Sequence, residues 1–155
     1  MKKEDFKGKK VTIMGLGLHG GGLGAAKFFV QAKAKVLVTD LRKKEDLKES
    51  IKKLANSPIK YVLGRHREED FINTDLVIKN PAVPDNSKYL AIAKKHSIPI
   101  ETDIGIFFQL CPAKIIGITG SRGKSTTATL IAKFLSKRYK NVVLAGNIRS
   151  SVLLQ

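Results

Sequence analysis

A loop at residues 117–127, GITGSRGKSTT, carries the clearest chemical pattern in the chain. An apolar β-type run precedes the loop and an amphipathic helical run follows it, which is the setting in which P-loops hold nucleotide phosphates. In such loops backbone amides face the β- and γ-phosphates, a lysine neutralises their charge and a hydroxyl binds Mg²⁺. The matching residues are Gly120, Ser121, Arg122 and Gly123 for the amides, Lys124 for the charge and Ser125 for the hydroxyl. A strict Walker A motif has glycine at the position of Ile118, so the prediction rests on T-G-x-x-G-K-S in its strand–loop–helix setting.

Another glycine-rich loop, GLGLHGGGLG, lies earlier in the chain, at residues 15–24 directly after the first apolar run. In chain order, this is the first glycine loop and the loop at 117–127 is the second. Gly15, Gly17 and Gly20 fit G-x-G-x-x-G, and Asp40 closes the next β-type run. Glycines let a strand turn sharply into a helix, so that backbone amides approach a phosphate at the helix N-terminus. The two further glycines that follow depart from the usual dinucleotide spacing. The loop therefore predicts either a Rossmann-type phosphate site or a tight turn that binds no ligand.

Expected strands and helices alternate along the chain, and they would position both loops. This alternation predicts an α/β fold with right-handed βαβ units and a parallel sheet. The expected strands cover residues 10–14, 35–39, 59–63, 75–78, 98–100, 115–119 and 141–144. The expected helices cover the segment between the first two strands and residues 44–56, 87–96 and 124–138. The last helix has one apolar face, typical of a core stripe, formed by Thr127, Leu130, Ile131, Phe134 and Leu135.

An interruption at residues 109–114, where Cys111 precedes Pro112, is the best boundary between two units. We expect a Rossmann-like parallel-sheet domain at 1–110. Residues 111–155 would then form the first strand–P-loop–helix–strand unit of a P-loop ATPase domain.

The composition is that of a globular protein, since 43% of the 155 residues are hydrophobic and 27% are charged. This excludes disordered and collagen-like classes. One cysteine cannot form an intramolecular disulfide, and the three histidines lack metal-ligand spacing, so neither disulfides nor zinc are expected to stabilise the fold. No apolar run reaches the roughly 18 residues that a spanning helix needs, and no signal-peptide core follows the Lys-rich start. We expect a cytoplasmic protein.

The net charge of +16 favours anionic partners, either nucleic acid or phosphorylated small molecules. A Lys-rich solvated surface would account for the same charge without any partner. With 3 Tyr, 7 Phe and no Trp, the chain lacks a base-stacking aromatic cluster, so specific nucleic-acid binding is not expected.

Taken together, the motifs resemble the N-terminal part of the Mur ligases and cover nearly the whole chain in the family's order. The resemblance is carried by GLGLHG at 15–20, TDLR at 39–42, DLVIKNPAVP at 75–84, ETDIGIFF at 101–108, the 117–127 loop and AGNI at 145–148.

The resemblance implies a first domain that holds the UDP part of UDP-N-acetylmuramoyl-L-alanine, and then the beginning of a domain that uses ATP and Mg²⁺. In that family, which makes peptidoglycan precursors, a substrate carboxylate attacks the γ-phosphate of ATP, and an amine, here that of D-glutamate, attacks the acyl phosphate. The implied UDP-substrate site comprises Leu18, His19, Asp40, Leu41, Arg42, Asn80 and Pro81. The implied ATP site comprises Gly120, Ser121, Arg122, Gly123, Lys124, Ser125 and Thr126, with Ser125 on Mg²⁺ and with Lys124 and Asn147 at the reacting centre. We expect a monomer.

Two positions depart from the family pattern, because Arg122 stands at an expected Asn and Ala145 at an expected Gly. The family's remaining central-domain residues and its C-terminal domain would follow Asn147, so we expect an N-terminal fragment that is inactive alone.

Two other classes of protein stay open, an NAD(P)-binding dehydrogenase domain and a basic nucleic-acid-binding module. The dehydrogenase hypothesis leaves Lys124 and Ser125 unexplained, since a dinucleotide fold needs no second, Mg²⁺-type phosphate loop. Without the resemblance, Asp40 could equally cap the end of its strand, and Arg42 could equally belong to a solvated run of basic residues.

Overall fold

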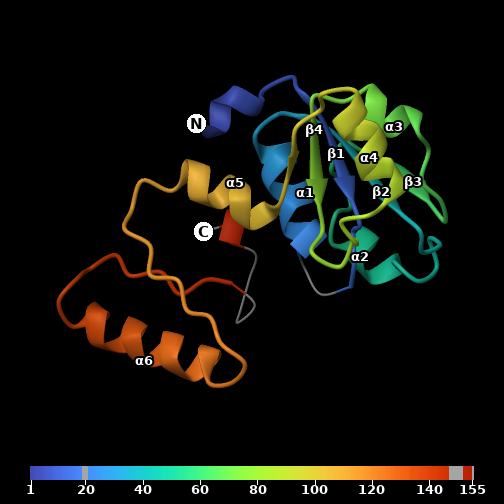
Figure 1. Ribbon diagram of the computed structural model, residues 1–155. Helices are drawn as coiled ribbons and strands as arrows, with labels where there is room; N and C mark the ends of the chain where they lie inside the picture. The colour runs from blue at the N-terminus through green and yellow to red at the C-terminus, as the bar shows by residue number, and fades with distance from the viewer. Residues whose placement is uncertain (19–20, 147–151, 155) are drawn as a thin grey trace.

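A computed structural model describes residues 1–18, 21–146 and 152–154, and a five-stranded, all-parallel sheet lies at its centre (Figure 1). Its strands are β1 (Lys10–Met14), β2 (Lys35–Asp40), β3 (Ile59–Leu63), β4 (Leu76–Lys79) and β5 (Ile100–Glu101), in the order β3-β2-β1-β4-β5. The α/β class and the parallel sheet expected from the sequence are confirmed.

Helices cover both faces of this sheet. They are η1 (Lys3–Phe6), α1 (Gly21–Gln31), α2 (Lys48–Lys52), α3 (Glu69–Ile72), α4 (Lys88–Lys95), α5 (Asp103–Leu110) and η2 (Val152–Leu154). The helix expected at 44–56 is shorter than predicted, because α2 spans only five residues with turns on either side.

Successive strand residues point to opposite faces, so one strand contributes to two cores. Val11 and Ile13 of β1 pack in the larger core, with α1 and α5. Met14 joins the smaller core with Phe71 of α3 and Leu90 of α4. Both cores are therefore built on the same central strand, which fixes the position of the glycine loop that follows it.

The sheet register brings the carboxyl ends of the three central strands to one edge. Met14 of β1 is opposite Thr39 of β2 on one side and Lys79 of β4 on the other. The chain adds β2 and β3 on one side of β1 and then crosses to add β4 and β5 on the other. Open α/β sheets bind ligands at this kind of switch point.

Among the described residues after 111, α6 (Lys124–Ser136) is the one α-helix, and it is set apart from the sheet (Figure 1). None of its residues is buried: Leu130 and Phe134 of its apolar face are exposed, and Ile131 and Leu135 are half-buried. The expectation that this stripe packs in a core is thus corrected.

The two strands expected at 115–119 and 141–144 are also corrected, because neither segment forms a strand. An apolar run becomes a strand only when a neighbour accepts and donates its backbone hydrogen bonds, and these segments join no sheet. No helix among the described residues is long and apolar enough to cross a membrane.

Candidate functional site

An open cavity of about 400 Å³ lies at the carboxyl edge of the sheet. The loops after β1, β2, β3 and β4 and the first turn of α4 surround it. Its lining comprises Met14, Gly15, Gly17, Asp40, Leu41, Arg42, His66, Asn80, Ala82, Val83, Pro84, Ser87, Lys88 and Tyr89. Segments far apart in the sequence therefore meet where the topology predicts a ligand site.

The turn after β1 depends on two glycines in left-handed backbone conformations. The φ angles of Gly15 and Gly17 are +92° and +67°, values that side chains disfavour. The Asp40 carboxylate holds this turn, since it accepts hydrogen bonds from the amides of Leu16 at 2.9 Å and Gly17 at 3.2 Å. It also accepts one from the Arg42 amide at 2.9 Å. Asp40 therefore ties the β1 loop to the β2 loop.

Asn80 ties the same turn to the loop after β4. Its side-chain nitrogen donates to the Gly15 carbonyl at 3.2 Å, and its side-chain oxygen accepts from the Ala82 amide at 3.1 Å. Its backbone amide donates to the Met14 carbonyl at 3.0 Å. Asn80 thus fixes the floor of the cavity.

The cavity combines apolar walls with positive charge at its rim. Leu41, Val83 and Tyr89 supply apolar surface, and Arg42 and Lys88 are exposed cations. Among the described residues, Arg42 makes no ion pair, whereas Lys88 lies 3.8 Å from the Glu68 carboxylate. The arrangement suits a flat, apolar group that carries an anion.

The structure brings together most, though not all, of the residues implied for the UDP substrate. Asp40, Leu41, Arg42 and Asn80 line the cavity. Pro81 lines a small adjoining pocket beside Gly21 and Gly22 instead. Leu18 is exposed and lies outside the cavity lining. His19 lies outside the described residues.

His66 and Tyr89 are among the cavity residues that were not predicted from the sequence. His66 follows β3 at the same sheet edge, and Tyr89 lies in the first turn of α4. Burial lowers the pKa of the His66 imidazole, although the carboxylates of Asp40 and Asp70 raise it in part. The sequence feature that could have identified His66 as a site residue is its position just past the end of a strand in a parallel sheet.

The second glycine loop forms the entry to α6. Gly120 and Gly123 have φ angles of +147° and +74°, and Gly123 is the N-cap of the helix. The Lys124 ammonium group folds back over the loop and donates to the Gly120 carbonyl at 2.6 Å and the Ser121 carbonyl at 3.4 Å. The loop thus has its lysine beside its backbone at a helix N-terminus.

This loop fits a phosphate group, because the first amides of a helix have no intrahelical partner and favour anions. Residues 120–126, including Arg122, are exposed and therefore accessible. The Ser125 hydroxyl offers one oxygen for Mg²⁺, which takes most of its ligands from water and phosphate. In the described chain, no group of three His, Cys, Asp or Glu side chains is arranged to hold a metal.

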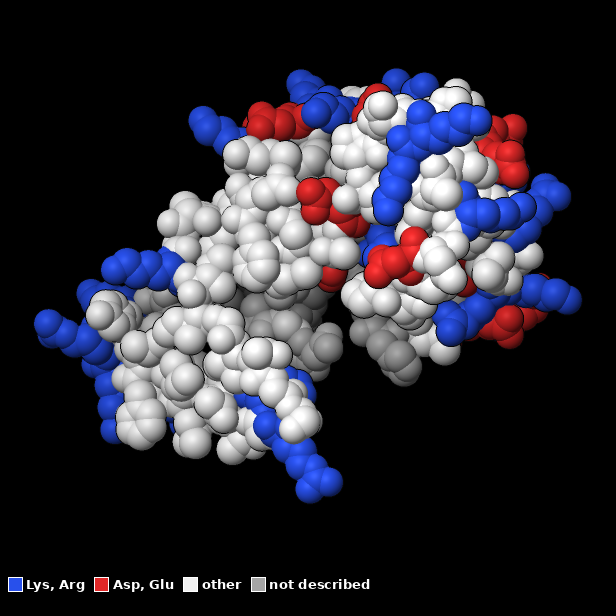
Figure 2. All heavy atoms as spheres, in the orientation of Figure 1, with Lys and Arg blue, Asp and Glu red and all other residues white. Residues whose placement is uncertain are grey.

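The two predicted sites do not meet in one cavity. None of the residues 120–126 lines the cavity at the sheet edge. Asn147, expected at the reacting centre, lies outside the described residues. Figure 2 shows Lys and Arg, but no Asp or Glu, over the part that holds α6, in keeping with a sequence that has no acidic residue after Asp103.

Comparison with known proteins gives a consistent result. A family model described as "Mur ligase MurD-like, N-terminal domain" matches residues 9–102. The chain is 49% identical over 148 residues to a UDP-N-acetylmuramoylalanine–D-glutamate ligase of Roseiflexus sp., covering 96% of this chain and 32% of that protein. It is 46% identical to the ligase of the same name from Treponema pallidum, covering 96% of this chain and 28% of that one. The chain thus spans about a third of the length of these relatives.

A solved structure shares the fold. It is a pseudomurein peptide ligase type C from Methanothermus fervidus, with a TM-score of 0.50 and 25% identity. The match covers 83% of this chain and 26% of that one.

Proposed function

Because the chain belongs to the Mur ligase family through a MurD-like N-terminal domain, we propose that residues 1–110 bind the UDP part of UDP-N-acetylmuramoyl-L-alanine. The observation that carries this proposal is the cavity at the carboxyl edge of the sheet, where the glycine turn, Asp40, Arg42 and Asn80 meet. In the whole protein, this domain would present the substrate for ligation to D-glutamate.

The chemistry of the cavity supports a nucleoside diphosphate. Arg42 offers a guanidinium group that pairs with phosphate oxygens in a planar, two-pronged geometry. The left-handed glycines keep side chains away from the turn, so that a phosphate can approach its backbone. Leu41, Val83 and Tyr89 supply surface against which a base can lie.

The loop before α6 supports a role for ATP. Lys124 would leave the carbonyls of Gly120 and Ser121 to meet a β- or γ-phosphate, and the helix amides would face the same group. The Ser125 hydroxyl would contribute one ligand to Mg²⁺. ATP would supply the phosphoryl group that activates the substrate carboxylate for attack by the amine of D-glutamate.

Asp40 argues against the alternative of a dinucleotide site. A Rossmann domain uses the acidic residue at the end of its second strand to bind a ribose hydroxyl. Here the Asp40 carboxylate accepts from three backbone amides, two at Oδ2 and one at Oδ1, which leaves little acceptor capacity for a ribose hydroxyl. Its main role in this fold is to shape the turn.

Calorimetric titration with UDP tests the proposal. We expect the Arg42→Ala variant to bind UDP about tenfold more weakly or worse, because loss of a charge-assisted hydrogen bond costs about 1.5–3 kcal/mol. Lys44→Ala is the matched control, since Lys44 is an exposed cation on the same loop and outside the cavity lining. Equal affinity of wild type and Arg42→Ala would refute the role given to Arg42.

A further inference from the structure

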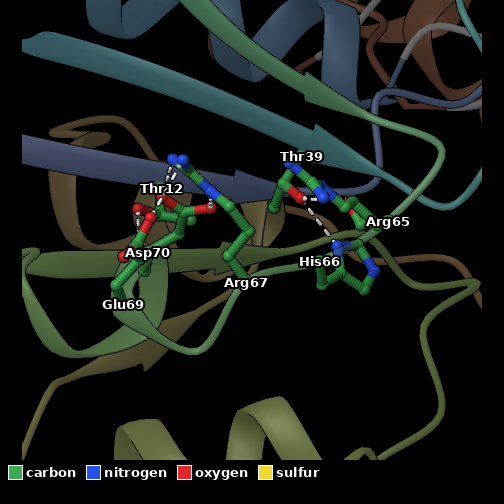
Figure 3. A network of polar contacts seen from close by, with 7 residues as sticks. All are labelled: Thr12, Thr39, Arg65, His66, Arg67, Glu69 and Asp70. Atoms are coloured by element: carbon green, nitrogen blue, oxygen red, sulfur yellow. Dashed lines mark hydrogen bonds and ion pairs between the residues drawn. The ribbon is translucent and has the colours of Figure 1, made fainter.

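His66 stands at the wall of the cavity, on the loop between β3 and α3 (Figure 3). Its half-buried ring makes edge-to-face contacts with Phe71, at 5.9 Å between ring centroids, and with Tyr89, at 5.0 Å. The Tyr89 hydroxyl donates to the His66 carbonyl at 3.2 Å. Residues of α3 and α4 therefore contact the His66 ring, and Tyr89 of α4 also binds its backbone.

The segment that follows His66 is also fixed. The Arg67 guanidinium forms two hydrogen bonds to the buried Asp70 carboxylate, at 2.9 and 2.6 Å. The Thr12 hydroxyl of β1 donates to the Asp70 carbonyl at 2.8 Å. Figure 3 shows how these contacts tie the loop to the sheet. His66 is therefore a preorganised part of the cavity wall.

A hydrogen-bond chain determines which ring nitrogen carries the proton. His66 Nδ1 lies 2.7 Å from the Thr39 hydroxyl, and that hydroxyl lies 3.2 Å from the Arg65 carbonyl, to which it donates. Thr39 is fully buried, and its hydroxyl has one hydrogen. Both contacts are satisfied only if Nδ1–H donates to Thr39 and Thr39 donates to Arg65. Nε2 of the neutral ring is then an acceptor, and it has no hydrogen-bond partner among the residues that the structure describes.

We propose that His66 Nε2 accepts a hydrogen bond from the N3–H group of uracil, which makes His66 a specificity-determining residue for uridine nucleotides. This inference rests on the proposed function. Uracil presents a donor at N3, whereas cytosine presents an acceptor there, so a fixed acceptor in the wall favours UDP over CDP. Burial lowers the pKa of the His66 imidazole, which favours the neutral ring. Sites built around such a bond discriminate strongly, because the wrong ligand leaves a polar group unpaired.

Titrations of UDP and CDP at pH 7.5 into wild type and His66→Phe test this role. The phenylalanine ring keeps the contacts with Phe71 and Tyr89 but removes the acceptor. We expect wild type to bind UDP roughly tenfold more tightly than CDP, and His66→Phe to bring the ratio close to one. His96→Phe is the control and should keep the wild-type ratio, since His96 is exposed and outside the cavity lining.

Two measurements need no variant and remain decisive if His66→Phe does not fold. The ¹⁵N chemical shifts of the His66 ring should show protonated Nδ1 and bare Nε2, with Nε2 shifting when UDP is added. UDP methylated at N3 should bind wild type roughly tenfold more weakly than UDP.

An unchanged UDP/CDP ratio in folded His66→Phe, or a proton on Nε2 in the free protein, would overturn this inference and leave the proposed function standing. Failure of wild type to bind UDP at all would overturn both.

Discussion

The Asp40 carboxylate links two of the loops that form the candidate site. It is 5% exposed and accepts hydrogen bonds from three backbone amides, on two different loops. A carboxylate is suited to this task because it has acceptor sites on both oxygens and no donor. The shape of the glycine turn therefore depends on one charged side chain.

Replacing Asp40 by Asn should destabilise the fold by about 1–3 kcal/mol, because the amide NH₂ would face a backbone donor where an oxygen now accepts. Urea unfolding followed by circular dichroism measures this change. The Asp46→Asn variant is the control, since Asp46 is exposed and accepts a single amide hydrogen bond, from Lys43. A free energy of unfolding for Asp40→Asn within about 0.5 kcal/mol of wild type would contradict the role of Asp40.

At this scale the sequence predicted which residues lie together at the sheet edge better than it predicted their contacts. Asp40, Arg42 and Asn80 were expected at the site, and all three line the cavity. That Asp40 points its carboxylate at the glycine turn was not predictable, because hydrogen-bond direction depends on how loops far apart in sequence meet. His66 was missed for the same reason, since its partner Thr39 lies on another strand.

The first helix packs unusually close to the turn that precedes it. A Cβ atom built on Gly22 would lie 2.2 Å from the Gly15 carbonyl oxygen and 2.5 Å from that of Leu16. Both neighbours are backbone atoms, so they cannot move aside without disturbing the turn. Only glycine fits here, which explains one of the additional glycines in the first loop.

Gly22→Ala should therefore cost about 1–3 kcal/mol of stability and weaken UDP binding, because the backbone must shift to relieve the overlap. Gly21→Ala is a close control. Its Cβ would meet side-chain atoms of Asn80 and Asp103 at 3.8 and 3.9 Å, which are ordinary contacts. Thermal unfolding compares the melting temperatures of the two variants. Equal values would contradict the close packing of Gly22 against the turn before α1.

The α6 region should open far more easily than the sheet. No residue of α6 is buried, and Phe134 is 67% exposed, whereas Phe29 of α1 is 0% exposed. Native-state hydrogen exchange should show α6 amides exchanging orders of magnitude faster than those of α1. Equal protection of the two helices would mean that α6 packs against the rest of the chain.

Sequence patterns identified elements well where a neighbour was present to complete them. The first four strands matched their expected positions to within one residue, because each has a partner in the register. The fifth strand, expected at 98–100, forms only at Ile100–Glu101, where it pairs with β4. The segments 115–119 and 141–144 have equally apolar sequences but form no strands. A hydrophobic pattern allows a segment to form a strand, but the segment does so only where it pairs with a neighbouring strand.

Over the whole molecule, several loops surround one candidate site, whereas the other consists of a single exposed loop. Four loops and the first turn of α4 form the sheet-edge cavity. The loop at 120–126 is exposed, and the segment that leads into it forms no strand. The positive charge of +16 suits anionic ligands at both. The enclosure by several loops therefore supports the proposal that the sheet-edge cavity binds the UDP substrate.

We predict that the 155-residue chain alone does not catalyse ligation. Phosphoryl transfer depends on positioning and on charge around the triphosphate, and no acidic residue follows Asp103 to help hold Mg²⁺ near the second loop. Phosphate release with UDP-N-acetylmuramoyl-L-alanine, D-glutamate, ATP and Mg²⁺ should stay at background. Substrate-dependent release that Lys124→Ala abolishes would contradict this prediction.

The most direct test of the central claim is a pair of calorimetric titrations of the 155-residue chain, one with UDP-N-acetylmuramoyl-L-alanine and one with NADH. The sheet-edge cavity has a glycine turn, an Arg42 that makes no ion pair within the described residues, and an Asp40 that accepts from three backbone amides. We therefore predict saturable binding of the UDP compound and none of NADH. Saturable binding of NADH without binding of the UDP compound would contradict the account and favour a dinucleotide-binding domain.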